Sequence, residues 1–289
     1  RLFLGLAIAA TAILVALVLL DGQPASAALI LGGFGLGIAF LKAEFSYPAS
    51  WRRFLTRGEA GGLLGGLIVI AICALAVVPV AALLPKFGGA IAPLGPSLFI
   101  GAFVFGIGMQ LANGCGSGTL YTVGGGSGRM LVTLALFVAG SVLGSLSLPS
   151  FLALGGIDPV LASDYFGAWG GLAVTLASIA LAAALIVAVA RRRGANYRPS
   201  RNYVIGGIAI GLLCVAVFFA GGHPWSVTFG YTVWGAKAAT ALGLDLSQSA
   251  FWQWPGPKRA LAESVLSDTS SLTDFGMLFG AMAAAAAAK

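Results

Sequence analysis

Charged residues are scarce in this chain. They make up 9% of its 289 residues, whereas hydrophobic residues make up 59% and the mean hydropathy is +0.99. A soluble domain carries about 25% charged residues because its surface faces water. So few charges exclude a water-soluble globular protein. The apolar runs are also far longer than the roughly 10-residue segments of barrel strands. The sequence therefore predicts an all-α polytopic membrane protein, in which residues 1–289 form a single transmembrane domain.

Cysteine and histidine are also rare, with three cysteines (Cys73, Cys115 and Cys214) and a single histidine, His223. An odd number of widely spaced cysteines excludes a disulfide framework, and this set lacks the spacing of a zinc site. We therefore expect no metal and no cofactor. Cys73 and Cys214 lie in uniformly apolar runs, where cysteine packs as a small hydrophobic residue.

The net charge of +7 comes from short basic clusters between apolar runs rather than from one basic surface. This is the pattern of cytoplasmic loops under the positive-inside rule, and it argues against a nucleic-acid partner. It places residues 42–57 and 191–201 on the cytoplasmic side. Counting spans from there places residues 85–96 and 149–166 outside.

Several apolar runs are long enough to cross a bilayer, which takes about 20 helical residues. They are Leu2–Leu20, Gly61–Leu84, Arg129–Leu148, Gly167–Ala190 and Tyr203–Ala220. Residues 27–41 form only a short apolar run, which predicts a tilted span or a re-entrant element. Residues 245–271 are expected to form a polar loop whose Trp252 and Trp254 anchor at lipid headgroups.

The most informative segment is the cysteine window, residues 106–128, where Cys115 stands between two glycines in a glycine-rich stretch. So much glycine disfavours a regular transmembrane helix. Non-helical backbone at membrane depth is tolerated only where it is buried in protein or lines a cavity. Backbone N–H groups freed by Gly114, Gly116 and Gly118 can form an anion-binding nest, and a half-helix starting near Thr119 would add positive potential.

The thiol of Cys115 is expected to be neutral, because burial disfavours a charged thiolate. A neutral S–H is a weak donor that can bind an anion and release it, as conduction requires. The alternative is that Cys115 only fills space beside glycine. An intramembrane polar break is costly and is more often functional.

Other polar residues are candidates for the same pathway. Gln110, Asn113 and Ser117 could contact a solute, or could satisfy backbone groups at the helix break. Lys237 is costly within an apolar run and could attract an anion, although snorkelling to the interface is the simpler interpretation.

The run Gly108-Met-Gln-Leu-Ala-Asn-Gly-Cys-Gly-Ser-Gly-Thr119, followed by Gly140-Ser-Val-Leu-Gly144, resembles the YeeE/YedE family of sulfur-transport membrane proteins, which includes thiosulfate uptake proteins of the TsuA type. Residues 35–53 and 234–237 are similar to further stretches of the family. The resemblance implies a bacterial inner-membrane transport domain of hourglass shape, with loops that meet near the membrane midplane. It also implies that Cys115 hands thiosulfate along through S–H···S contacts.

Two departures from the family pattern matter. Ser46 stands where family members often have a cysteine, which puts a relay of several thiols in doubt. Family members usually carry a further half-motif near the C-terminus, and this sequence reaches residues 283–289 without it. We therefore expect either that the sequence is part of a longer chain or that a second subunit completes the pore.

The resemblance also implies a partner, a small cytoplasmic TusA-like sulfur carrier, beside the lipid bilayer and the thiosulfate substrate. Two alternatives stay open at this point. One is a membrane sulfurtransferase that forms a persulfide on Cys115, which would need a base or cation beside the thiol. The other is a transporter for selenium or another sulfur species.

Overall fold

The computed structural model describes residues 1–288, and this part of the chain is almost entirely helical. Seven helical segments within it are long and apolar enough to cross a membrane. This confirms the prediction of an all-α polytopic membrane protein. Outside the helices, an isolated antiparallel bridge joins Leu94 and Ile157.

After the first helix, α1, the chain forms two units with the same order of elements: a long helix, a sharp break, a short helix and a returning helix. The bounds of these helices are α1 Leu2–Leu20, α2 Pro24–Ala43, α3 Tyr47–Arg57, α4 Gly61–Leu83, α5 Pro96–Ala112, α6 Gly116–Gly124 and α7 Gly128–Leu152. In each unit the long helix ends at a non-glycine residue in the left-handed region. Glu44 follows α2 with φ 49° and Asn113 follows α5 with φ 56°, and within residues 1–288 no other non-glycine residue has positive φ.

The rest of the chain adds two long helices, several short ones and a final buried helix. Their bounds are α8 Ala162–Arg192, α9 Arg201–Gly221, α10 Val227–Ala241, α11 Ala250–Gln253, α12 Pro255–Ala262, η1 Val265–Ser267 and α13 Thr269–Ala287. Helix α8 is kinked near its start at Gly167, whose φ is 70°.

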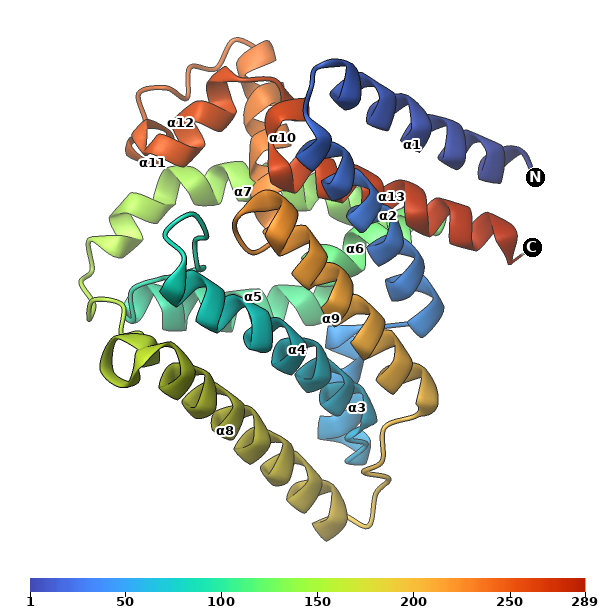
Figure 1. The fold of residues 1–289 in the computed structure, drawn as a ribbon, viewed down its shortest axis with the longest axis vertical. Coiled ribbons are helices and arrows are strands. Elements are labelled where there is room, and N and C mark those ends of the chain that lie inside the picture. Colours follow the sequence, from blue (N-terminus) through green and yellow to red (C-terminus); the bar gives the residue numbers. More distant parts are fainter. Residues whose placement is uncertain (289) are drawn as a thin grey trace.

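Helix α13 runs below α1 to the C-terminus at the right-hand side of the view and packs along α2 (Figure 1). Glycines on both helices allow their backbones to touch. A Cβ on Gly37 would collide with the carbonyl of Met277, and one on Gly276 with the carbonyl of Ile30. Close approach through small residues is a typical way for helices to associate in lipid. Buried side chains of α13, including Leu272 and Met277, continue this contact into the main apolar core.

Two ends of the molecule carry different residues. At one end, which we call the basic face, α3 meets the α8–α9 connection, and Arg193 donates a hydrogen bond to the carbonyl of Leu55. At the opposite end, the loop after α4 contacts two other loops. Gly88 N–H donates to Gly222 O, and Leu94 pairs with Ile157. The structure therefore gathers residues 42–57 with 191–201. It also links the loop at 85–96 both to the loop within 149–166 and to the loop after α9, as the charge pattern predicts.

One predicted span was too short, and one predicted loop was wrong. The apolar run at 27–41 is part of α2, a full 20-residue helix, because Pro24–Ser26 and Lys42–Ala43 also adopt helical geometry. Residues 245–271 contain α11, α12 and η1 rather than a plain loop. Trp252 there is not a headgroup anchor: it is 1% exposed, and its indole N–H donates to Ser145 Oγ at 3.2 Å.

Candidate functional site

The cysteine window is broken between α5 and α6 at residues 113–115. Asn113 adopts the left-handed conformation and its N–H caps α5 at the carbonyl of Met109. Cys115 is extended, with φ −90° and ψ −177°, and is the N-cap of α6. The half-helix therefore begins at Gly116, slightly earlier than the expected start near Thr119. Its N-terminus brings partial positive charge next to the thiol.

The Cys115 side chain is half-buried and takes the place that a serine or aspartate usually occupies at a helix N-cap. Its Sγ accepts a hydrogen bond from Gly118 N–H at 3.3 Å and lies 3.6 Å from Ser117 Oγ. Neither neighbour is a base. Because the N–H occupies a lone pair of sulfur, the S–H proton is free to point elsewhere.

The three glycines around Cys115 are each required by a close neighbour. A Cβ on Gly114 would lie 2.7 Å from Thr119 Oγ1, and one on Gly118 would lie 3.1 Å from Cys115 Sγ. A Cβ on Gly116 would lie 2.9 Å from Val227 at the start of α10. Glycine is therefore used here for close packing around the thiol.

Two tyrosine hydroxyls hold the break in place. Tyr231 of α10 is fully buried and donates to Gly116 O at 2.8 Å. Tyr121 of α6 donates to Phe45 O at 3.3 Å, and Phe45 lies in the break between α2 and α3. The first helix break is thus joined to α6, the short helix that follows the second break.

Arg52 of α3 is a residue of the site that sequence reasoning missed. Its guanidinium donates to Asn113 Oδ1 at 2.9 Å and to Gln110 Oε1 at 3.3 Å. Gln110 in turn donates to Pro48 O at 3.2 Å. Gln110 and Asn113 therefore connect α5 to α3, and they bring a positive charge to the end of α5, two residues before Cys115. The positive-inside pattern had assigned Arg52 to topology alone.

Ser46 occupies in the first unit the position that Cys115 occupies in the second. It is the N-cap of α3, and its Oγ accepts from Ala49 N–H at 3.4 Å. Both residues follow a left-handed residue by two positions and both cap a short helix.

Lys237 lies apart from this arrangement. Its ammonium group donates to the carbonyls of Leu261 and Glu263 at the end of α12. These carbonyls have no helical partner of their own, so Lys237 caps α12. Its hydrogen-bond partners all lie on that side of the molecule rather than in the cysteine window.

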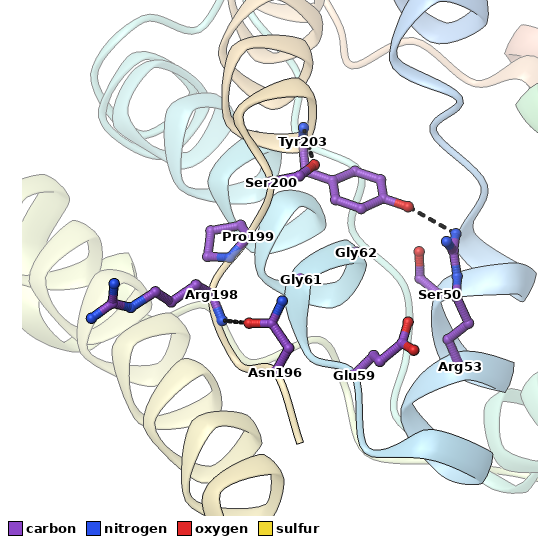
Figure 2. A pocket seen from close by; sticks show the side chains of 10 residues that line it. All are labelled: Ser50, Arg53, Glu59, Gly61, Gly62, Asn196, Arg198, Pro199, Ser200 and Tyr203. Carbon is purple, nitrogen blue, oxygen red and sulfur yellow. Dashed lines mark hydrogen bonds between the residues drawn. The ribbon is translucent and has the colours of Figure 1, made fainter. Parts of the chain in front are cut away.

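A pocket of about 490 Å³ opens at the basic face, shown in Figure 2. Ser50, Arg53 and Glu59 line one side of it, and Arg53 donates to the hydroxyl of Tyr203 at 2.8 Å. The Arg198 side chain points away from the pocket (Figure 2). Hydrogen bonding from Arg198 and Arg191, followed by their positive charges, lowers the pKa of Tyr197. Arg53 and Glu59 carry opposite charges and partly offset each other within the pocket.

The sequence model of the family described as Sulphur transport matches residues 42–289. A protein named Probable transporter YedE from Salmonella typhimurium is 29% identical over 195 residues, which are 63% of this chain and 46% of that protein.

A protein of the same name from Escherichia coli K12 is 29% identical over 181 residues, which are 59% of this chain and 42% of that protein. The chain thus spans less than half the length of these curated relatives. The family match extends over most of the chain and includes both helix breaks, and both relatives are named as transporters. This polytopic membrane protein therefore belongs to the sulphur transport family.

Proposed function

We propose that this protein takes up thiosulfate, or a closely related sulfur oxyanion, by non-covalent passage past the thiol of Cys115. The observation that carries the proposal is the position of Cys115 as the N-cap of a broken helix within a sulphur transport protein. The thiol stands where free backbone N–H groups and the helix dipole favour an anion.

The chemistry of the site suits weak and reversible binding. A neutral S–H donates weakly to an anion, and sulfur is polarisable, so it also suits a ligand that ends in sulfur. The guanidinium of Arg52, held at Asn113, would attract a dianion toward the break. Gly114, Gly116, Ser117 and Gly118 shape the binding surface, and Ser46 offers a hydroxyl at the equivalent cap of the first unit.

The charge pattern supports a place in the bacterial inner membrane with the basic face toward the cytoplasm. A small TusA-like sulfur carrier would then receive the anion at that face. The arginines gathered there by α3 and the α8–α9 connection would suit an acidic partner.

A membrane sulfurtransferase is the second candidate, since Cys115 could instead form a persulfide. That reaction needs an activated thiolate, with a base or cation close by. In residues 1–288 the hydrogen-bond partners of Cys115 Sγ are Gly118 N–H and Ser117 Oγ, and neither is a base that could take the thiol proton. The nearby cation, Arg52, donates to Asn113 and Gln110 rather than to the thiol.

The test is uptake of labelled thiosulfate by the purified protein in liposomes, with sulfate and selenite as competitors. We expect saturable thiosulfate flux that empty liposomes lack and that sulfate inhibits poorly. Absence of flux would contradict the proposal, and preferential flux of selenite would reassign the substrate. Mass spectrometry during turnover separates the two candidates, because a persulfide on Cys115, one sulfur atom heavier, would favour the sulfurtransferase.

A further inference from the structure

Asp274 is a carboxylic acid in the interior of a membrane protein. It lies on α13 and is 0% exposed. One oxygen, Oδ1, accepts from the indole N–H of Trp225 at 2.9 Å, whereas Oδ2 has no partner among the described residues. A single N–H bond does not compensate for a buried negative charge. Ionisable residues in such positions are rare and commonly mark ion or proton pathways.

Few titratable groups surround Asp274. Tyr231 faces it from α10, and Asp268 lies one and a half turns away at the start of α13. Of the other helices packed against α13, α1 has no titratable residue, α2 has only Lys42 at its far end, and α6 contributes Tyr121. Helix α10 also carries Lys237, but its ammonium group donates to the carbonyls of Leu261 and Glu263 instead. No cation among these groups balances the carboxylate, so Asp274 is not one half of a buried ion pair.

A series of polar groups leads to Asp274 from the loop after α9. His223 in this loop is exposed, and its Nε2 lies 2.9 Å from Thr269 Oγ1 at the start of α13. A pocket of about 200 Å³ beside His223 also includes Arg259, Glu263 and Asp268. On its other side, His223 borders a narrow gap that reaches Trp225 and Ser270.

The narrow gap has no room for a water molecule in this conformation, so a small movement of the loop or of α13 must open it. The hydroxyl of Ser270, which lines the gap, is buried and has no partner in this part of the chain. Ser270 and Asp274 are one helical turn apart on the same face of α13. Two polar atoms without a partner in the described residues, Ser270 Oγ and Asp274 Oδ2, thus lie in sequence along α13 from the gap toward the interior.

Asp274 is also in contact with the helix that holds the cysteine window. A Cβ on Gly230 of α10 would collide with Asp274 Oδ2, so the carboxyl group lies directly against the α10 backbone. The next residue, Tyr231, donates to Gly116 O beside Cys115. A change in the charge of Asp274 would therefore act on the residue that positions the N-terminus of α6.

We propose that Asp274 is a proton-carrying site, loaded from the outer face by way of His223, and that a proton accompanies each imported anion. This inference rests on the proposed function, since it couples a proton to that transport. A dianion entering a negative-inside cell is opposed by the membrane potential, and a co-transported proton reduces the charge that must cross.

The proton transfer balances without any redox partner. On loading, a hydronium ion outside gives a proton through the His223 imidazole to Asp274, an O–H bond forms at the carboxylate, and water is left. On release inside, the same O–H bond breaks and the proton returns to water. No electrons are exchanged.

The experiment compares wild type, Asp274→Asn and Asp164→Asn in liposomes, with labelled thiosulfate and a pH-sensitive dye inside. Asp164 is an exposed residue of the first turn of α8, so it provides the same chemical change away from the route.

An inward gradient of one pH unit should raise thiosulfate accumulation by up to about tenfold per proton carried, because one pH unit is a tenfold difference in proton activity. Wild type and Asp164→Asn should show this response, with internal acidification. Asp274→Asn should still equilibrate thiosulfate down its own gradient but should not respond to pH.

A wild type that equilibrates thiosulfate without any response to the gradient would overturn the proton site while leaving the proposed function intact. So would an Asp274→Asn variant that responds like wild type. Absence of flux in wild type at equal pH would refute the proposed function itself. If Asp274→Asn does not fold, His223→Gln provides the test. It should slow thiosulfate accumulation driven by the pH gradient without lowering the final level. An unchanged rate of accumulation would reject the route through His223.

Discussion

At the scale of single residues, Cys115 is unusual because sulfur is a weak acceptor for a helix cap. Serine, threonine, aspartate and asparagine are the usual residues at this position. The Gly118 N–H···Sγ contact at 3.3 Å therefore stabilises α6 less than a hydroxyl would. Such weak capping is what a thiol that serves the proposed contact with the anion would show.

This gives Cys115→Ser and Cys115→Ala different signatures. Serine should cap α6 better and raise stability by about 0.5 kcal/mol, whereas alanine should lower it by about 1 kcal/mol. Thiosulfate uptake should fall in both, by roughly tenfold or more for alanine, because a hydrogen bond to a charged group contributes about 1.5–3 kcal/mol. Thermal unfolding in detergent and liposome uptake measure the two effects. Full uptake by Cys115→Ala would show that the thiol is only a space filler.

Gly116 tests whether the packing around the thiol matters. In Gly116→Ala the new Cβ would meet Val227 at 2.9 Å, so α6 and α10 must separate. Overpacking of this kind costs about 1–3 kcal/mol, and we expect a lower Tm and reduced uptake. Gly108→Ala is the control, because it lies in α5 with nothing within 4 Å of the added Cβ. Equal behaviour of the two variants would contradict a tightly packed site.

The sequence identified Cys115 and its glycines because they interrupt an apolar pattern, and such an interruption is visible locally. It missed Arg52 and Asp274 for a different reason. Arg52 belongs to a basic cluster that topology alone explains, and its contact with Asn113 joins residues far apart in the chain. Asp274 is a single acid in the final apolar run, and only packing against Gly230 and Trp225 shows that it is enclosed.

At the scale of elements, helix pairing was harder to predict than helix position. The sequence placed α1, α4 and α9 to within a few residues, because length and hydropathy suffice for that. Gly140 and Gly144 have the four-residue spacing of a helix-packing motif, yet a Cβ on either would meet nothing within 4 Å. The closest helix pair is instead α2 with α13, and small residues alone do not specify which partner they meet.

Gly276→Ala tests the pairing of α2 and α13. Its Cβ would collide with the carbonyl of Ile30, a backbone atom that cannot rotate away. We expect a loss of at least about 1–3 kcal/mol and a clearly lower Tm. Gly140→Ala in α7 is the matched control and should stabilise by about 0.5–1 kcal/mol, as alanine does in a helix interior. Thermostability in detergent compares them, and a harmless Gly276→Ala would rule out backbone contact.

At the scale of the whole molecule, the two ends of the helices are distinguished by charge. Arginines from α3 and from the α8–α9 connection meet at the basic face, although well over a hundred residues separate them in the chain. The loops at 85–96 and 149–166 are joined through Leu94 and Ile157. The positions of the basic loops predicted this division, because loops rich in lysine and arginine stay on the cytoplasmic side of the membrane.

Labelling of single cysteines in intact cells tests the orientation. In a background with Ser at positions 73, 115 and 214, Arg192→Cys should react with a membrane-impermeant maleimide only after the cells are opened. Asp158→Cys, in the loop bridged at Ile157, should react without opening. Both positions are exposed, so reactivity reports the side rather than burial. The reverse labelling pattern would invert the topology.

The pairing of α2 with α13 also sets the order in which the protein can mature. Helix α2 leaves the ribosome early, whereas α13 is made more than two hundred residues later. During that interval the glycine face of α2 lies in the bilayer without α13 packed against it. A chain that ends before residue 269 would therefore lack the helix that covers the glycine face of α2.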